Sequence, residues 1–149
     1  MRYMAYDADL NFVDDIVDFE KDFLGGTWEN TKKYIPELAG PFKALPVVQH
    51  NGSTINETGA CAQYIAEIAG YMPKSPLDRA RVIMICDHIY EDILINISYG
   101  LWGFREWDRD VIGGFAGPTS GLPLKFVNLE NTLAESASGF AVGNEISMA

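Results

Sequence analysis

The stretch that decides the fold is LPVVQHNGSTINETGACAQYIAEIAG, residues 45–70. Its Asn51-Gly52 pair lies between VVQH and STIN, and a type I′ hairpin turn requires two residues that tolerate positive φ. Apolar residues then recur at the three- and four-residue spacing of one helical face: Cys61, Tyr64, Ile65 and Ile68. The sequence therefore predicts a β-hairpin that runs directly into a helix ending at Gly70.

Both ends of this stretch predict a place for a ligand. A helix N-terminus offers unpaired N–H groups and a positive dipole end, so a carboxylate fits at Thr58 and Gly59. The Thr58 hydroxyl, alone or with Asn56, either caps the helix or donates to a bound anion. Pro46 is unusual at the start of a buried strand. A cis bond there would turn the Leu45 N–H and C=O toward a ligand's backbone, and an edge-strand proline is the alternative.

The sequence before the stretch predicts short, mixed elements. Residues 1–8 read as the end of a helix. Residues 11–19 (NFVDDIVDF) have the β-branched and aromatic content of a short, half-exposed strand. Thr27 is expected to cap a helical turn. That turn carries three large side chains: Trp28, Lys32 and Lys33.

The sequence after the stretch predicts long helices. A linker with two prolines, residues 73–76, precedes helices expected at 77–99 and 124–137. Residues 100–121, rich in glycine and aromatic residues, are expected to be irregular. The second helix has an apolar stripe that is expected to be buried: Phe126, Leu129 and Leu133. The chain is thus mixed α/β before the linker and helical after it.

Composition excludes several classes of protein. A net charge of −10 argues against a nucleic-acid or anionic-membrane surface, because Lys and Arg drive phosphate binding.

Cys61 and Cys86 lie far apart without a CxxC, so we expect two reduced core thiols and no zinc site. The first ten residues include Asp7 and Asp9 and have no apolar core, so they are no signal peptide. No apolar stretch is long enough to span a membrane, and we expect a cytoplasmic protein.

Common catalytic motifs are absent from the sequence. There is no Walker loop, G-x-S-x-G, HExxH or dinucleotide fingerprint. His50 and His88 have no ligand-like spacing to a second His or Cys. We expect His50 on the surface of the hairpin and His88 on the surface of a helix, and we expect no metal.

Residues 45–70 strongly resemble the glutathione-binding half of the cytosolic glutathione S-transferases, most of all the sigma, pi and mu branch. The likeness continues in four further segments: RYMAYDADLNFVDD, TWENTKKY, LDRARVIMICDHIYEDI and GFAVGNEISMA. This resemblance implies a thioredoxin-like α/β domain over residues 1–72 and an all-helical domain over residues 73–149. It also implies that both are incomplete, with the family's first strand upstream of Met1 and further helices beyond Ala149.

The resemblance makes glutathione the expected co-substrate and assigns roles within the deciding stretch. Leu45 would exchange main-chain hydrogen bonds with the cysteinyl unit, as an added strand does, with Pro46 in the cis form. Glu57 would pair with the γ-glutamyl amine. Thr58 would hold the γ-glutamyl carboxylate.

Further roles fall outside that stretch. By the same resemblance, Trp28 would pack beside the glycyl end of glutathione. Lys32, or Lys33, would pair with the glycyl carboxylate. Asp87 would reach the γ-glutamyl amine across the interface of a homodimer.

Chemistry in this family begins with thiolate activation: a Tyr or Ser hydroxyl on the first strand stabilises the glutathione sulfur, which attacks an electrophile. That residue is expected upstream of Met1, so no catalytic residue is assigned. Tyr3 and Tyr6 fall in the helix that follows and do not inherit the role. One aromatic cluster either lines a pocket for a small electrophile or belongs to the core: Trp102, Phe104 and Trp107.

Two classes of function follow from the sequence. The first is a glutathione transferase that conjugates small electrophiles in detoxification or glutathione metabolism. The second is a non-catalytic protein of the same fold that serves as a structural, ligand-carrying or interaction protein. A thioredoxin-like reductase is disfavoured because no CxxC is present.

Overall fold

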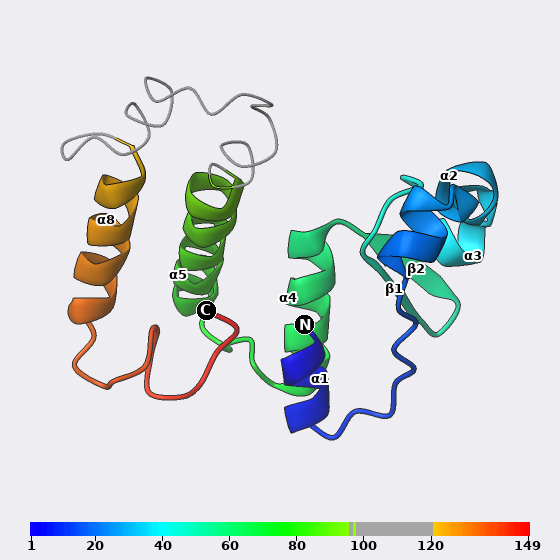
Figure 1. The fold of residues 1–149 in the computed structure, drawn as a ribbon. Coiled ribbons are helices and arrows are strands. Elements are labelled where there is room, and N and C mark those ends of the chain that lie inside the picture. The colour runs from blue at the N-terminus through cyan, green and yellow to red at the C-terminus, as the bar shows by residue number, and fades with distance from the viewer. Residues whose placement is uncertain (96, 98–120) are drawn as a thin grey trace. The chain divides into compact units, whose positions relative to one another are not determined.

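The structure is a computed structural model that describes residues 1–95, 97 and 121–149. The chain forms two compact units, Met1–Tyr71 and Met72–Ala149 (Figure 1). Unit 1 contains short helices and one hairpin, in the order α1 (Arg2–Asp7), π-helical η1 (Phe19–Leu24), α2 (Thr27–Asn30), 3-10 helix η2 (Lys32–Tyr34), α3 (Pro36–Ala39), β1 (Val47–His50), β2 (Ser53–Asn56) and α4 (Thr58–Ala69). Unit 2 contains α5 (Pro76–Asp87), π-helical η3 (His88–Leu94) and α8 (Leu122–Ala134).

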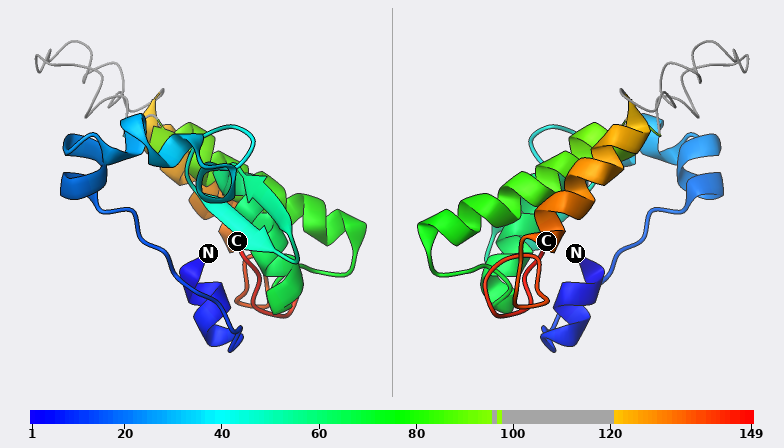
Figure 2. Two further views of the ribbon diagram at one scale, coloured as in Figure 1. Left: turned by 90° about the vertical axis from the view of Figure 1, so that its right-hand side faces the viewer. Right: turned by 90° about the vertical axis from the view of Figure 1, so that its left-hand side faces the viewer.

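The predicted hairpin is confirmed. Strands β1 and β2 pair antiparallel from Val47 opposite Asn56 to His50 opposite Ser53. The turn residues Asn51 and Gly52 have φ values of 50° and 75°, which is the positive-φ pair of a type I′ turn. The hairpin leads directly into α4, against which β2 packs (Figure 2).

Helix α4 packs against both β2 and α1 within unit 1. Cys61 and Ala66 are fully buried on its inner face, while the predicted face residue Ile68 is 43% exposed. Gly70 ends the helix with φ 82°, as predicted. α1 packs against α4, and the Tyr71 hydroxyl just beyond α4 donates a hydrogen bond to the Asp7 carboxylate at the end of α1. The helix predicted over residues 1–8 is therefore confirmed as α1.

Two local predictions in unit 1 are wrong. Residues 11–18 form no strand, and the chain instead enters η1. β-branched residues form stable strands only beside a pairing strand, and the sheet of the described chain contains β1 and β2 alone. Thr27 does not cap α2, because the N-cap is Gly26 in the left-handed region at φ 76°. The Thr27 hydroxyl instead donates to the Lys21 carbonyl.

The first long helix of unit 2 is confirmed over its described part. Ser75 caps α5 through its hydroxyl, which accepts from the Asp78 N–H, and Pro76 begins the helix. α5 continues without a break into η3. The core of unit 2 is formed by Val82 and Ile85 of this helix and by Val142 from the C-terminal segment.

The second long helix, α8, lies alongside the α5–η3 helix (Figure 2). Its predicted buried stripe is largely wrong: Phe126 is 49% and Leu133 39% exposed. Only Leu129 packs against the core cluster, because the described neighbours of α8 cover one narrow side of it. The irregular segment predicted at 100–121 and the aromatic cluster at 102–107 lie outside the described residues, apart from Gly121.

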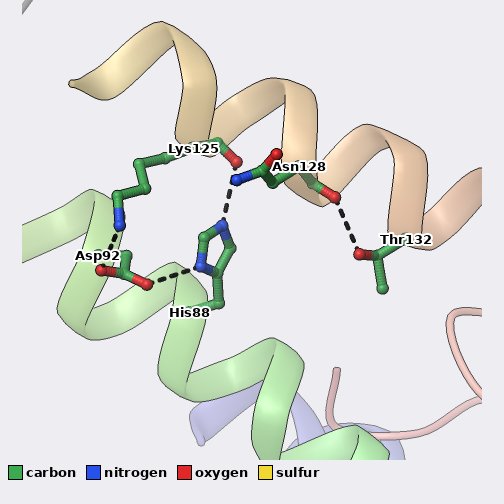
Figure 3. A network of polar contacts seen from close by, with 5 residues as sticks. All are labelled: His88, Asp92, Lys125, Asn128 and Thr132. Carbon is green, nitrogen blue, oxygen red and sulfur yellow. Dashed lines mark hydrogen bonds and ion pairs between the residues drawn. The ribbon is translucent and has the colours of Figure 1, made fainter. Parts of the chain in front are cut away.

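A polar network joins η3 to α8 (Figure 3). The Nδ1 atom of His88 lies 2.8 Å from Asp92 Oδ2, and its Nε2 atom donates to the Lys125 carbonyl at 3.0 Å. The Lys125 ammonium pairs with the other Asp92 oxygen at 2.8 Å. The expectation that His88 is a surface residue is wrong, since its side chain is only 22% exposed and both ring nitrogens are engaged.

Candidate functional site

The hairpin register brings the Leu45–Pro46 bond and the start of α4 to the same end of the sheet. Val47 is the first residue of β1 and pairs with Asn56, the last residue of β2, so Leu45 and Pro46 lie at the end of the hairpin where α4 begins. The Leu45–Pro46 peptide bond is cis, as predicted. Leu45 is 38% exposed, and no hydrogen bond joins its main chain to the described part of the molecule. This end of the hairpin therefore presents an unused N–H and C=O.

The N-terminus of α4 is also open. Glu57 is the N-cap residue, with φ 71° and ψ 130°, and its side chain makes no capping bond. Thr58 is the first helical residue, so its predicted role as the N-cap is wrong. Asn56 does not cap either, because its side chain turns back to the preceding loop. The first N–H groups of α4 and the Thr58 hydroxyl consequently have no side-chain partner among the residues described.

Trp28 and the two lysines lie on the short helices of unit 1. Trp28 is 5% exposed on α2. The Lys32 ammonium pairs with Asp22 at 2.7 Å, and Lys33 pairs with Glu29 and lies over the Tyr34 ring. Elements η2 and α3 pack together, and α3 packs on β1, so a continuous set of contacts leads from the lysines to the hairpin.

Asp22 is a buried partner that sequence reasoning missed. It is 2% exposed, and its Oδ2 atom accepts from the Lys32 ammonium and from the Asp18 N–H. The hydrogen bond from Lys32 lowers the pKa of this carboxyl below its ordinary value, against the opposing effect of burial. Its other oxygen, Oδ1, is buried without a partner in the described part of the chain. A carboxylate ten residues before a lysine carries no recognisable spacing signal, so only the tertiary fold reveals the pair.

The remaining candidate residues that the structure describes lie on the separate elements β1, α4 and α5. Asp87 is exposed at the end of α5, in unit 2. His50 is exposed on the hairpin, as predicted, with Nδ1 at 2.7 Å from the Tyr64 hydroxyl. Cys61 is buried and Cys86 half-buried, and both are free thiols whose pKa is raised by burial. Cys61 thus lies in the core, as expected, whereas Cys86 packs beside the core of unit 2.

The described residues contain neither a metal-binding cluster nor a membrane-spanning helix. Over residues 1–95, 97 and 121–149, no three His, Cys, Asp or Glu side chains gather in a way that could hold a metal ion. Within the same ranges, no helix combines the length and the apolar character that crossing a membrane requires.

Similarity to known proteins defines the class. No family model matches the chain. It is 30% identical over 109 residues to the probable glutathione S-transferase 6 of Caenorhabditis elegans, covering 71% of this chain and 52% of that protein. It is 35% identical over 122 residues to the maleylacetoacetate isomerase of Mus musculus, covering 76% and 52%. The chain thus spans about half the length of these curated relatives.

Solved structures agree with the relatives. A glutathione S-transferase of Caenorhabditis elegans superimposes with a TM-score of 0.76 at 23% identity, covering 99% of this chain and 67% of that one. The enzyme from Ascaris lumbricoides gives 0.69 at 24% identity, again covering 99% and 67%. These likenesses confirm a thioredoxin-like α/β portion followed by a helical portion. The chain belongs to the cytosolic glutathione S-transferase family.

Proposed function

We propose that this chain carries the glutathione-binding site of a glutathione transferase. The observation that carries the proposal is the meeting of two unused sets of main-chain groups at one end of the hairpin: those of Leu45 and those that open α4. An extended peptide pairs with a free strand end through main-chain hydrogen bonds, and a carboxylate fits at a helix N-terminus. Glutathione is a small peptide with a carboxylate at each end, so it meets both requirements.

Residue roles in the proposal combine this geometry with the family likeness. Leu45, beside Pro46, holds the cysteinyl unit through its main chain. The exposed Glu57 carboxylate pairs with the γ-glutamyl ammonium, and Thr58 donates to the neighbouring carboxylate. Trp28 packs beside the glycyl end.

Two charged side chains, one at each end of the bound glutathione, complete the proposed site. Lys32 (or Lys33) neutralises the glycyl carboxylate. Asp87 approaches the γ-glutamyl amine from the second subunit of a homodimer. Both assignments rest on the family likeness.

The proposed reaction is conjugation. The glutathione thiolate attacks a small electrophile, forming a carbon–sulfur bond while the leaving group departs or the electrophilic bond takes up the electron pair. The bound thiol must first lose its proton, and none of the residues assigned above supplies the hydroxyl that stabilises the thiolate. Tyr3 is 90% and Tyr6 64% exposed on α1, which gives neither the role. The proposal includes a cytoplasmic location and a part in detoxification.

A non-catalytic protein that retains glutathione is the second candidate. Passing the chain over immobilised glutathione and eluting with free glutathione tests binding, and a chloronitrobenzene substrate tests conjugation. Retention with conjugation supports the transferase. Retention without conjugation supports the binding protein, whereas a chain that is not retained would remove both.

A further inference from the structure

Asn56 is a buried amide that holds the loop before Leu45. It is 4% exposed at the end of β2. Its Nδ2 atom donates to two carbonyls, that of Ala39 at 3.0 Å and that of Ala44 at 2.7 Å. Its Oδ1 atom accepts from the Phe42 N–H at 3.3 Å. One side chain thus satisfies three main-chain groups of a loop that lies 12 to 17 residues earlier in the sequence.

Gly40 provides the space for this amide. The residue has φ 62°, in the region that favours glycine. A Cβ atom at this position would lie 2.2 Å from Asn56 Oδ1 and 2.8 Å from its Cγ. The loop and the amide therefore fit together only because position 40 carries no side chain.

We infer that Asn56 is a positioning residue for glutathione binding, acting through Leu45. Its shortest bond, to the Ala44 carbonyl, fixes the peptide group that joins Ala44 to Leu45. Fixing that group sets the direction of the Leu45 N–H, which the proposed function uses to bind the cysteinyl unit. The inference rests on that function, but it adds a residue that does not itself touch the ligand. Holding a binding group in place before the ligand arrives reduces the entropy cost of binding.

The test compares Asn56→Ala with Asn131→Ala, which makes the same change at an exposed position of α8. We expect Asn56→Ala in the full chain to raise the Kd for glutathione about tenfold, or about 1.4 kcal/mol, and Asn131→Ala to leave it unchanged. Amide hydrogen exchange should quicken at Phe42, Lys43 and Ala44. Exchange in the β1–β2 ladder should stay slow. Unchanged affinity, or faster exchange across the whole hairpin, would overturn the inference.

Two further variants keep the test decisive if Asn56→Ala does not fold. Asn56→Asp retains the acceptor for Phe42 but places a carboxylate oxygen against two carbonyls, so affinity should again fall. Gly40→Ala should displace the amide and reduce affinity similarly, and its loss should not add to that of an Asn56 variant. Fully additive losses would show that the two positions act separately and would overturn the inference. Failure of the unaltered chain to bind glutathione would instead remove the proposed function, and this role with it.

Discussion

The Lys32 ammonium lies 2.7 Å from the Oδ2 atom of Asp22, whose side chain is almost completely buried. The pair joins η1 to η2, so it connects two short helices. A buried carboxylate needs a cation or several donors to remain ionised. Lys32 therefore has a structural task in addition to any part in binding glutathione.

This pair predicts an acid-sensitive element in unit 1. The pKa of Asp22 is lowered in the folded chain, chiefly by its hydrogen bond from Lys32. Its contribution to stability is accordingly present above the unfolded pKa, near 3.8, and is lost as the pH falls through the lower folded value. Asp22→Asn should reduce the fall in urea-unfolding midpoint between pH 5 and pH 2. The exposed Asp15→Asn serves as the control, and equal slopes for both variants would contradict the prediction.

A second prediction separates the two lysines. Lys33 is held by Glu29, which raises its pKa, whereas Lys32 is held by Asp22. We expect Lys32→Met to raise the Kd for glutathione about tenfold, as loss of a charged hydrogen bond does, and Lys33→Met to change it less than about twofold. Calorimetric titration measures both.

Removing Lys32 also leaves the buried Asp22 carboxylate without its cation. The double variant Asp22→Asn/Lys32→Met is the control for that effect, and it should regain stability but not affinity. A larger loss of affinity with Lys33→Met would assign the glycyl carboxylate to Lys33 instead.

Thr58 gives a third prediction. Its hydroxyl has no partner in the described chain and belongs to the first residue of α4. Thr58→Ala should weaken glutathione binding by about 1–3 kcal/mol, because the bound carboxylate loses a hydrogen-bond donor. The stability of the free chain should hardly change, since the hydroxyl caps nothing. Thr31→Ala, an exposed threonine of the same unit, is the matched control; unchanged binding by Thr58→Ala would exclude this residue from the site.

The network between η3 and α8 gives a fourth prediction, in unit 2. Hydrogen bonds from Lys125 and then His88 lower the pKa of Asp92. The stabilising effect is therefore present above the unfolded pKa, near 3.8, and fades as the pH falls through the folded value. Asp92→Asn should lower the hydrogen-exchange protection factors of the α8 amides at pH 6. It should also remove the fall of these protection factors with acid. Glu130→Gln, an exposed acid of α8, should have no such effect; identical exchange for the two variants would contradict the prediction.

The local elements with strong sequence signals could be predicted. A type I′ turn requires positive φ at both central residues, and few residue pairs accept this as readily as Asn51-Gly52. The hairpin therefore followed from two residues. Helix α4 followed from its apolar spacing and its end at Gly70, and α5 followed from the change of composition after Pro76. The failures occurred where the outcome depended on neighbours. Among the described residues, 11–18 have no pairing strand, and Leu129 alone of the α8 stripe packs against the core cluster.

By itself, the sequence determined the order of hairpin and helix, the positions of Leu45, Glu57 and Thr58 along it, and the family, because these depend on residues close together in the chain. Only the tertiary structure decided that Asn56 turns away from α4 to hold the loop before Leu45, and that Asp22 is the partner of Lys32. A buried polar group must find hydrogen-bond partners wherever the folded chain brings them. Those partners lie 10 to 17 residues away in the sequence, so no local sequence pattern predicts them.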